Sequence, residues 1–275
     1  MSDGSPRVAM PLVVTLLSQV VTAAGLFTVA VLAERIAPEL GIPKALVGYY
    51  VALVFLGAGI VSFFSGGPVA RYGPVRATQI GILVMAPAIL LANTALVWCL
   101  PISALLLGLG YGPFTPAASQ ILADATAPRW RALVFSVKQA GAPMGAMTAG
   151  IALPMIEKPF GWRAAALVTV VALLLTVFLL QPVRRSLDAR RSRAESLAPH
   201  RSARALRDLM ADLELRRLTI ASFVFAMMQM SLFSLVIVFL VAEYLVDAGD
   251  NDLILAGAIY STMQVGGLFS RIVWG

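Results

Sequence analysis

Long apolar runs separated by short polar joints dominate the pattern of the chain. They fall near residues 10–33, 46–65, 77–98, 101–123, 132–156, 163–183 and 218–245, and an eighth starts near 253. About 20 helical residues cross the roughly 30 Å core of a bilayer. Backbone groups in lipid must be satisfied within their own segment, so these runs predict helices rather than strands. Prolines break the short joints, which makes neighbouring helices antiparallel hairpins. The pattern therefore predicts an all-α integral membrane fold.

One long polar segment interrupts the apolar pattern. Residues 184–217 are rich in arginine, and Leu206, Leu209, Met210 and Leu213 recur among them at helical spacing. Such a segment is typical either of a solvated helix that links two bundles or of an amphipathic helix on the membrane surface. We therefore expect an N-terminal six-helix bundle over 1–183, a basic linker over 184–217 and part of a second bundle over 218–275.

Composition and charge agree with a membrane protein. The hydrophobic fraction is 59% and the charged fraction 13%, against about 45–50% and 25% in soluble domains. Fifteen arginines fall at one set of loop ends: Arg7, Arg71, Arg76, Arg129, Arg131, Arg184, Arg185, Arg190, Arg191, Arg193, Arg201, Arg204, Arg207, Arg216 and Arg217. The opposite set has four basic residues: Arg35, Lys44, Lys158 and Arg163. Positive charge favours the cytoplasmic side, so we expect a cytoplasmic N-terminus. The collection of arginine on one side of the membrane accounts for the net charge of +7. We therefore expect no nucleic-acid partner.

Enzyme chemistry is disfavoured by the sequence. It has no nucleophile–base pair, no metal-ligand spacing and no phosphate-binding loop in a polar context. The lone Cys99 excludes an internal disulfide. We expect no enzymatic activity, no cofactor and no metal.

The joint between the second and third runs carries a family resemblance. Gly66, Arg71, Tyr72, Gly73 and Arg76 match the pattern G-x-x-x-D-R-x-G-x-x-R, which joins helices 2 and 3 of major facilitator superfamily (MFS) transporters. Ala70 stands where that pattern has aspartate. The resemblance implies that Gly66, Arg71, Gly73 and Arg76 form a conformational-switch loop. In the family the aspartate is expected to brace a helix end, so its absence bears on the balance of states.

Further motifs extend this resemblance along the chain. Residues 136–145 resemble the S-x-K-Q-x-G-x-P-x-G opening of helix 5 in bacterial MFS transporters, 160–165 the F-G-W-R-x-A step into helix 6, and 270–275 the G-R-I-x-W-G end of helix 8. A shift of 209 positions also brings Gly66 onto Gly275 and Gly57 onto Gly266. Such repeats are typical of two six-helix halves. We therefore expect a chain that is truncated within helix 8 of a longer transporter.

Two cations within the apolar runs are candidates for substrate binding. Lys138 and Arg271 lie about 10 Å and 6 Å from the nearest cytoplasmic end at 1.5 Å per residue. Intramembrane charges normally face protein or water, and no Asp or Glu lies at comparable depth. In oxalate and monocarboxylate carriers of this superfamily an arginine of helix 8 is implicated with the substrate carboxylate, and Arg271 resembles it in setting. The alternative is that both cations snorkel to the inner surface or pair with acids elsewhere.

Uncharged polar residues complete the candidate cavity. Gln19, Gln139, Gln229, Gln264 and Tyr111 could hydrogen-bond a substrate or cross-link helices. Gly141, Pro143 and Gly145 are typical of close helix packing and of a hinge.

The expected function is secondary active transport by alternating access in the cytoplasmic (inner) membrane of a bacterium. The expected substrate is a small organic anion, with or without coupled protons. We expect the protein to be a monomer surrounded by membrane lipid. Two alternatives remain: efflux of amphipathic drugs, favoured by an apolar cavity near Met227, Met228 and Met230, and a non-transporting membrane sensor or scaffold.

Overall fold

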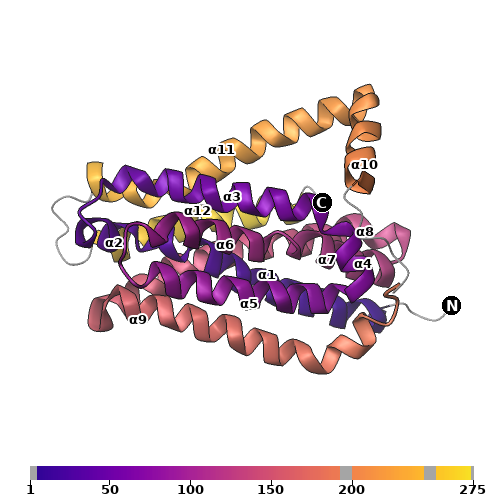
Figure 1. Ribbon diagram of the computed structural model, residues 1–275, viewed down its shortest axis with the longest axis horizontal. Helices are drawn as coiled ribbons and strands as arrows, with labels where there is room; N and C mark the ends of the chain where they lie inside the picture. The colour runs from indigo at the N-terminus through magenta and orange to yellow at the C-terminus, as the bar shows by residue number, and fades with distance from the viewer. Residues whose placement is uncertain (1–4, 193–199, 245–251, 274–275) are drawn as a thin grey trace.

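The computed structural model describes residues 5–192, 200–244 and 252–273, and within them all regular structure is helical (Figure 1). The helices are α1 (Ser5–Val31), α2 (Ala33–Glu39), η1 (Lys44–Leu46), α3 (Val47–Phe64), α4 (Gly66–Tyr72), α5 (Pro74–Ala92), α6 (Cys99–Tyr111), α7 (Phe114–Ala125), η2 (Pro128–Trp130), α8 (Arg131–Gln139), α9 (Gly141–Leu187), α10 (His200–Ala211), α11 (Leu213–Glu243) and α12 (Asp252–Val273). The all-α membrane prediction is confirmed.

Five helical segments of the described chain are long and apolar enough to cross a membrane. They are Val8–Val31, Lys44–Phe64, Pro74–Ala92, Cys99–Ala125 and Pro128–Leu187. The last has 60 residues and turns back on itself at Gly161, where φ is +80°, so it supplies the fifth and sixth predicted crossings. Helix α11, bent by 41°, and the apolar stretch Leu253–Gly267 of α12 correspond to the seventh and eighth runs.

Two of these crossings are each divided into two helices. The fourth crossing is divided into α6 and α7 at Gly112 and Pro113. Proline has no N–H to continue the helical ladder, so a break at this position is expected. The fifth crossing is divided into α8 and α9 at Ala140, directly after Lys138 and Gln139.

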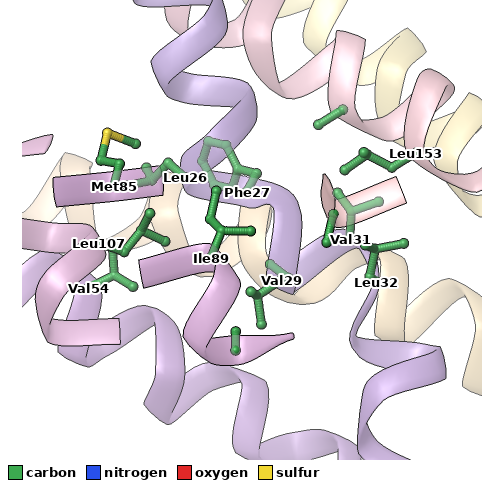
Figure 2. Packing of buried hydrophobic residues seen from close by; sticks show 14 of the residues in the cluster. Leu26, Phe27, Val29, Val31, Leu32, Val54, Met85, Ile89, Leu107 and Leu153 are labelled. Carbon is green, nitrogen blue, oxygen red and sulfur yellow. The ribbon is translucent and has the colours of Figure 1, made fainter. Parts of the chain in front are cut away.

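The core lies around α1, which packs most extensively against α9 (Figure 2). Phe27 and Leu26 lie among Met85, Ile89 and Leu107 from α5 and α6. Gly145 lets α9 approach α1 closely, since a Cβ there would lie 2.7 Å from Ala23 Cβ. In lipid the helices gain little from hydrophobic association, so small residues at such crossings govern how closely they pack.

The loops that the charge pattern assigns to one side do meet at one end of the bundle, here called the arginine-rich end. Ser192 donates its backbone N–H to Ala70 O at 2.9 Å, and Arg190 lies 3.4 Å from Asp124. At the opposite end basic residues pair with acids: Arg35 with Glu157, Lys44 with Glu34 and Arg163 with Glu39. Those pairs were not anticipated from the sequence.

Helix α12 crosses α9 at a contact between two glycines. A Cβ on Gly257 would collide with Gly150 O and lie 3.3 Å from Pro154 Cγ. Beside this crossing, Ser261 Oγ donates to Met147 O at 3.1 Å. Because residue numbers rise along α12 as they fall along α9, the two helices run antiparallel.

Helix α11 approaches the other helices near its C-terminal end and slopes away from α3 toward α10 and the arginine-rich end (Figure 1). Residues 213–228 are exposed, whereas Ile237 and Val241 are buried. The polar segment 184–217 holds the last turn of α9, α10 and the first turn of α11, so Leu213 lies on a different helix from Leu206, Leu209 and Met210.

Candidate functional site

Lys138 is a buried basic residue within the fifth crossing. It lies in the last turn of α8 and is 1% exposed. Its Nζ lies 5.7 Å from the centre of the Phe114 ring and 3.5 Å from Gln139 Oε1. An ammonium over an aromatic face is attracted to the electron-rich ring. Both of these neighbours are uncharged.

Gln19 and Tyr111 form a hydrogen bond next to this lysine. Gln19 Nε2 donates to Tyr111 Oη at 3.0 Å and so links α1 to α6. The Tyr111 ring in turn stacks on Phe114, with centroids 6.3 Å apart and an angle of 16° between the planes. Phe114 therefore connects the Gln19–Tyr111 pair to Lys138.

The break between α8 and α9 brings Gln19 close to the lysine segment. A Cβ on Gly141 would lie 2.8 Å from both Cβ and Cγ of Gln19, so the glycine is what admits the glutamine side chain. Gln19 is 2% exposed, and its Oε1 has no hydrogen-bond partner among the described residues. A buried acceptor without a donor is costly. This atom is therefore available to a donor group that enters the bundle.

Helix α12 contributes a second polar group to the interior. Gln264 and Tyr260 are each 1% exposed, and both polar atoms of the Gln264 amide are buried without a hydrogen-bond partner among the described residues. The antiparallel crossing places Gln264 one turn beyond Ser261, toward α8, and α12 packs against α8. We define the polar cluster as Gln19, Tyr111, Lys138 and Gln264.

The other predicted site residues are more dispersed. Gln139 is exposed although it accepts from Lys138, and Gln229 is half-buried in α11. Arg271 belongs to the last turn of α12, and its side chain lies outside the described part of the structure. Pro143 is buried in the first turn of α9, beside Gly141.

Sequence analysis did not identify Phe114 or Ser261 as neighbours of the site. Phe114 is one of 13 phenylalanines, and only its position after the Gly112–Pro113 break distinguishes it. Ser261 lies in an apolar helix where a hydroxyl normally bonds to its own backbone, as Ser261 also does with Gly257 O at 2.7 Å.

An apolar pocket lies apart from the polar cluster, between α3 and α11. It has a volume of about 330 Å³ and its wall includes Phe55, Phe223, Met227 and Met230. Met228, which the sequence placed with these methionines, is 69% exposed instead. Aromatic and methionine side chains adapt to apolar ligands of varied shape.

The predicted switch loop is more ordered than a simple tether. Residues Gly66–Tyr72 form α4, and the chain then turns at Gly73, where φ is +101°. The Asp188 carboxylate, which follows α9, accepts from the backbone N–H of Val75 at 2.8 Å and of Arg76 at 3.3 Å. It thereby caps the N-terminus of α5, whose orphan N–H groups need acceptors.

Burial raises the pKa of Asp188 above its ordinary value, and the two backbone hydrogen bonds and the nearby Arg184 and Arg191 oppose that shift. Asp188 is the only acid between Arg184 and Arg193. That isolation among arginines was the one signal in the sequence that could have drawn attention to it.

Comparison with known proteins gives one family. The model described as Major Facilitator Superfamily matches residues 15–275. Comparison with curated proteins finds no match. Among solved structures, the crystal structure of the peptide transporter POT in complex with sulfate is similar at a TM-score of 0.52 and 17% identity, covering 84% of this chain and 50% of that one. A mutant of that transporter in complex with alafosfalin gives 0.52 and 20%, covering 78% and 45%.

This chain thus spans about half the length of the solved structures that it matches. At 17% and 20% sequence identity, the similarity to these structures shows a shared fold and no more.

Proposed function

This chain belongs to the major facilitator superfamily, and from that premise we propose that it supplies the first half and the start of the second half of a secondary transporter. The proposed transporter moves a small organic anion across the cytoplasmic membrane of a bacterium by alternating access. In this proposal residues 1–183 form the first bundle, 184–217 the linker and 218–275 part of the second bundle.

The observation that carries the proposal is the buried Lys138 in the polar cluster. A charge at this depth costs about 2.5–3.5 kcal/mol on insertion scales, and intramembrane charges normally serve a function. Phe114 of α7 and Gln139 of α8 contact it, and the Gln19–Tyr111 pair of α1 and α6 packs on Phe114. Helix α12, which carries the buried Gln264, packs against α8, so we infer that an anion bound at Lys138 contacts both halves of the protein. A substrate in that position can couple its own binding to the relative motion of the two halves.

The uncharged members of the cluster have complementary roles in this proposal. Lys138 attracts the carboxylate, and the amides of Gln19 and Gln264 orient the remainder of the substrate by hydrogen bonds. Gln19 Oε1, which is buried without a described partner, accepts from a hydroxyl or an N–H of the substrate. A hydroxylated or aminated carboxylate therefore fits this cluster better than a plain fatty acid.

The deciding experiment is uptake of labelled small carboxylates into proteoliposomes that carry the full-length gene product. We expect Lys138→Gln to lower the uptake rate at least tenfold and Lys138→Arg to retain part of it. Lys158→Gln is the matched control, because it removes one positive charge at the opposite end of the fifth crossing. Arg271→Gln is measured beside them. Wild-type uptake by Lys138→Gln would overturn the anion proposal.

Proton coupling and orientation belong to the same proposal. With the N-terminus and the arginine-rich end in the cytoplasm, as the positive-inside rule indicates, anion uptake coupled to protons rises when the medium outside is made more acidic. Uptake that is unchanged by an imposed pH gradient would remove protons from the mechanism.

Efflux of amphipathic drugs is the second candidate, and the apolar pocket between α3 and α11 favours it. If that pocket binds the transported molecule, Phe223→Ala and Met230→Ala reduce export of an amphipathic cationic dye, while Lys138→Gln does not. The reverse pattern supports the anion carrier.

The loop with Gly66, Arg71, Gly73 and Arg76 is proposed as the conformational switch. Its fixed geometry at Gly73 and its bonds to Asp188 support the idea that it moves as one body with the end of α9.

A further inference from the structure

A second pocket of the described chain is basic and lies at the arginine-rich end, apart from the polar cluster. It has a volume of about 370 Å³ and is lined by Arg71, Tyr72, Arg76 and Arg191. We propose that this basic pocket binds the phosphate-bearing headgroup of an anionic phospholipid. The proposal is independent of what the protein transports.

The pocket is assembled by backbone interactions from separate segments. Arg71 lies in the last turn of α4 and Arg76 in the first turn of α5, with the Gly73 turn between them. Arg191 comes from the segment after α9, which the Ser192 N–H to Ala70 O bond fixes beside α4. The backbone contacts therefore hold the three arginines around one pocket before any ligand arrives, which lowers the entropy cost of binding.

The charge of this pocket is not neutralised within the described chain. Arg184 lies 3.8 Å from Asp188 and Arg190 lies 3.4 Å from Asp124, so those two arginines have carboxylate partners. Arg71 and Arg76 form no ion pair with any described residue, and Asp188 is shared by Arg184, Arg191 and two backbone N–H groups. Among the described residues, the three arginines that line the pocket therefore have no carboxylate of their own. Asp188 lies near Arg191, but it also interacts with Arg184 and with two backbone N–H groups.

Guanidinium forks match the geometry of phosphate oxygens and bind them with pairs of hydrogen bonds. The N-terminus of α5 is not the anion site, because Asp188 already occupies its first N–H groups. The phosphate is therefore held by the arginine side chains themselves.

The position of the pocket favours a lipid over a soluble phosphate. Arg71 and Tyr72 lie between the crossings Lys44–Phe64 and Pro74–Ala92, Arg76 lies in the first turn of the latter, and Arg191 follows the crossing segment Pro128–Leu187. Tyr72, 46% exposed, lines the pocket, and Phe63 and Phe64 are exposed one turn before α4. Tyrosine favours the headgroup region, and basic residues beside a span attract anionic lipid. The acyl chains can then lie along α3 while the phosphate occupies the pocket.

Native mass spectrometry of the purified full-length protein tests this inference with added phosphatidylglycerol or phosphatidylcholine. The pocket variant carries Arg71→Gln, Arg76→Gln and Arg191→Gln. The matched control carries Arg129→Gln, Arg207→Gln and Arg217→Gln, three exposed arginines outside the pocket. We expect the pocket variant to bind phosphatidylglycerol at least tenfold more weakly than wild type, and the control to stay within twofold. Phosphatidylcholine should bind wild type at least tenfold more weakly than phosphatidylglycerol.

Equal losses in both variants, or equal binding of the two lipids, would reduce the effect to general surface charge and overturn the proposal. Binding of two soluble phosphate compounds, inorganic phosphate and glycerol 1-phosphate, is measured in parallel. If either binds wild type as tightly as phosphatidylglycerol, the pocket is a soluble-phosphate site and the lipid assignment is wrong. If the glutamine variant fails to fold, the corresponding triple lysine variant replaces it. The lysine variant keeps the positive charges but lacks the planar guanidinium groups that can form paired hydrogen bonds with phosphate, so we expect it to bind phosphatidylglycerol several-fold more weakly. Binding as tight as that of the wild type would contradict the proposal.

Discussion

Gly73 lies directly against Asp188, so closely that a Cβ on the glycine would be 2.6 Å from the carboxylate Oδ1. The same glycine has φ of +101°, a region that residues with a side chain rarely adopt. The position therefore requires glycine for two separate reasons. It joins the loop between the second and third crossings to the end of the sixth.

Replacing Gly73 tests this contact. We expect Gly73→Ala to lower the free energy of unfolding by about 2–3 kcal/mol, because it adds backbone strain and displaces the Asp188 carboxylate. Thermal unfolding in detergent, followed by helical circular dichroism, measures the change. Gly66→Ala is the control, since a Cβ there meets nothing within 4 Å. A Gly73→Ala protein as stable as the Gly66→Ala protein would show that the contact is unimportant.

Removal of the Asp188 carboxylate should loosen the first turn of α5. We expect Asp188→Ala to cost about 1–2 kcal/mol, the usual effect of losing a helix N-cap. Amide hydrogen exchange at Val75 and Arg76 should accelerate, because their acceptor is lost. Asp124→Ala, which removes another carboxylate at the same end but no helix cap, provides the comparison. Unchanged protection at both amides in Asp188→Ala would contradict the capping role.

The crossing of α9 and α12 should tolerate no side chain at Gly257. A Cβ would collide with Gly150 O, and backbone cannot move aside as a flexible side chain can. We expect Gly257→Val to destabilise the protein by about 1–3 kcal/mol, the usual cost of overpacking. The detergent unfolding midpoint reports this loss. Gly266→Val serves as control on the same helix, since nothing lies within 4 Å of its Cβ position. Equal midpoints for the two variants would argue against a tight crossing.

Glu39 should titrate below its ordinary pKa. Hydrogen bonds from Arg163 and then Trp162 lower the pKa of this carboxyl from 4.5, and Trp162 Nε1 donates to it at 2.7 Å. A lowered pKa means that the folded state favours the charged form. The resulting stabilisation is complete above pH 4.5 and is lost as the pH falls from 4.5 through the lowered value. Isotope-edited NMR titration of the Glu39 carboxyl measures the pKa directly, and Arg163→Gln should move it back toward 4.5. A Glu39 pKa at or above 4.5 in the wild-type protein would refute the pairing.

The sequence by itself determined the membrane class, the order of the apolar helical segments and which loops share an end. Those properties depend on local quantities: about 20 apolar residues per crossing, internally satisfied backbone hydrogen bonds and the side on which arginine collects. Family motifs such as the Gly66–Arg76 loop are likewise read along the chain. For that reason the all-α fold and the superfamily were predicted correctly.

Only the tertiary structure decided which side chains meet. Lys138 faces Phe114, Gln19 bonds to Tyr111 across 92 residues, and Asp188 caps a helix that begins 114 residues earlier. No periodicity predicts such contacts, because they depend on helix breaks at Gly112, Ala140 and Gly161 and on how closely paired glycines let the helices approach. The hydrophobic pattern requires each helix to cross the membrane. It does not determine how each helix is rotated about its axis or which helices it contacts, because these depend on side-chain packing. Packing therefore determined both the polar cluster and the brace at Gly73.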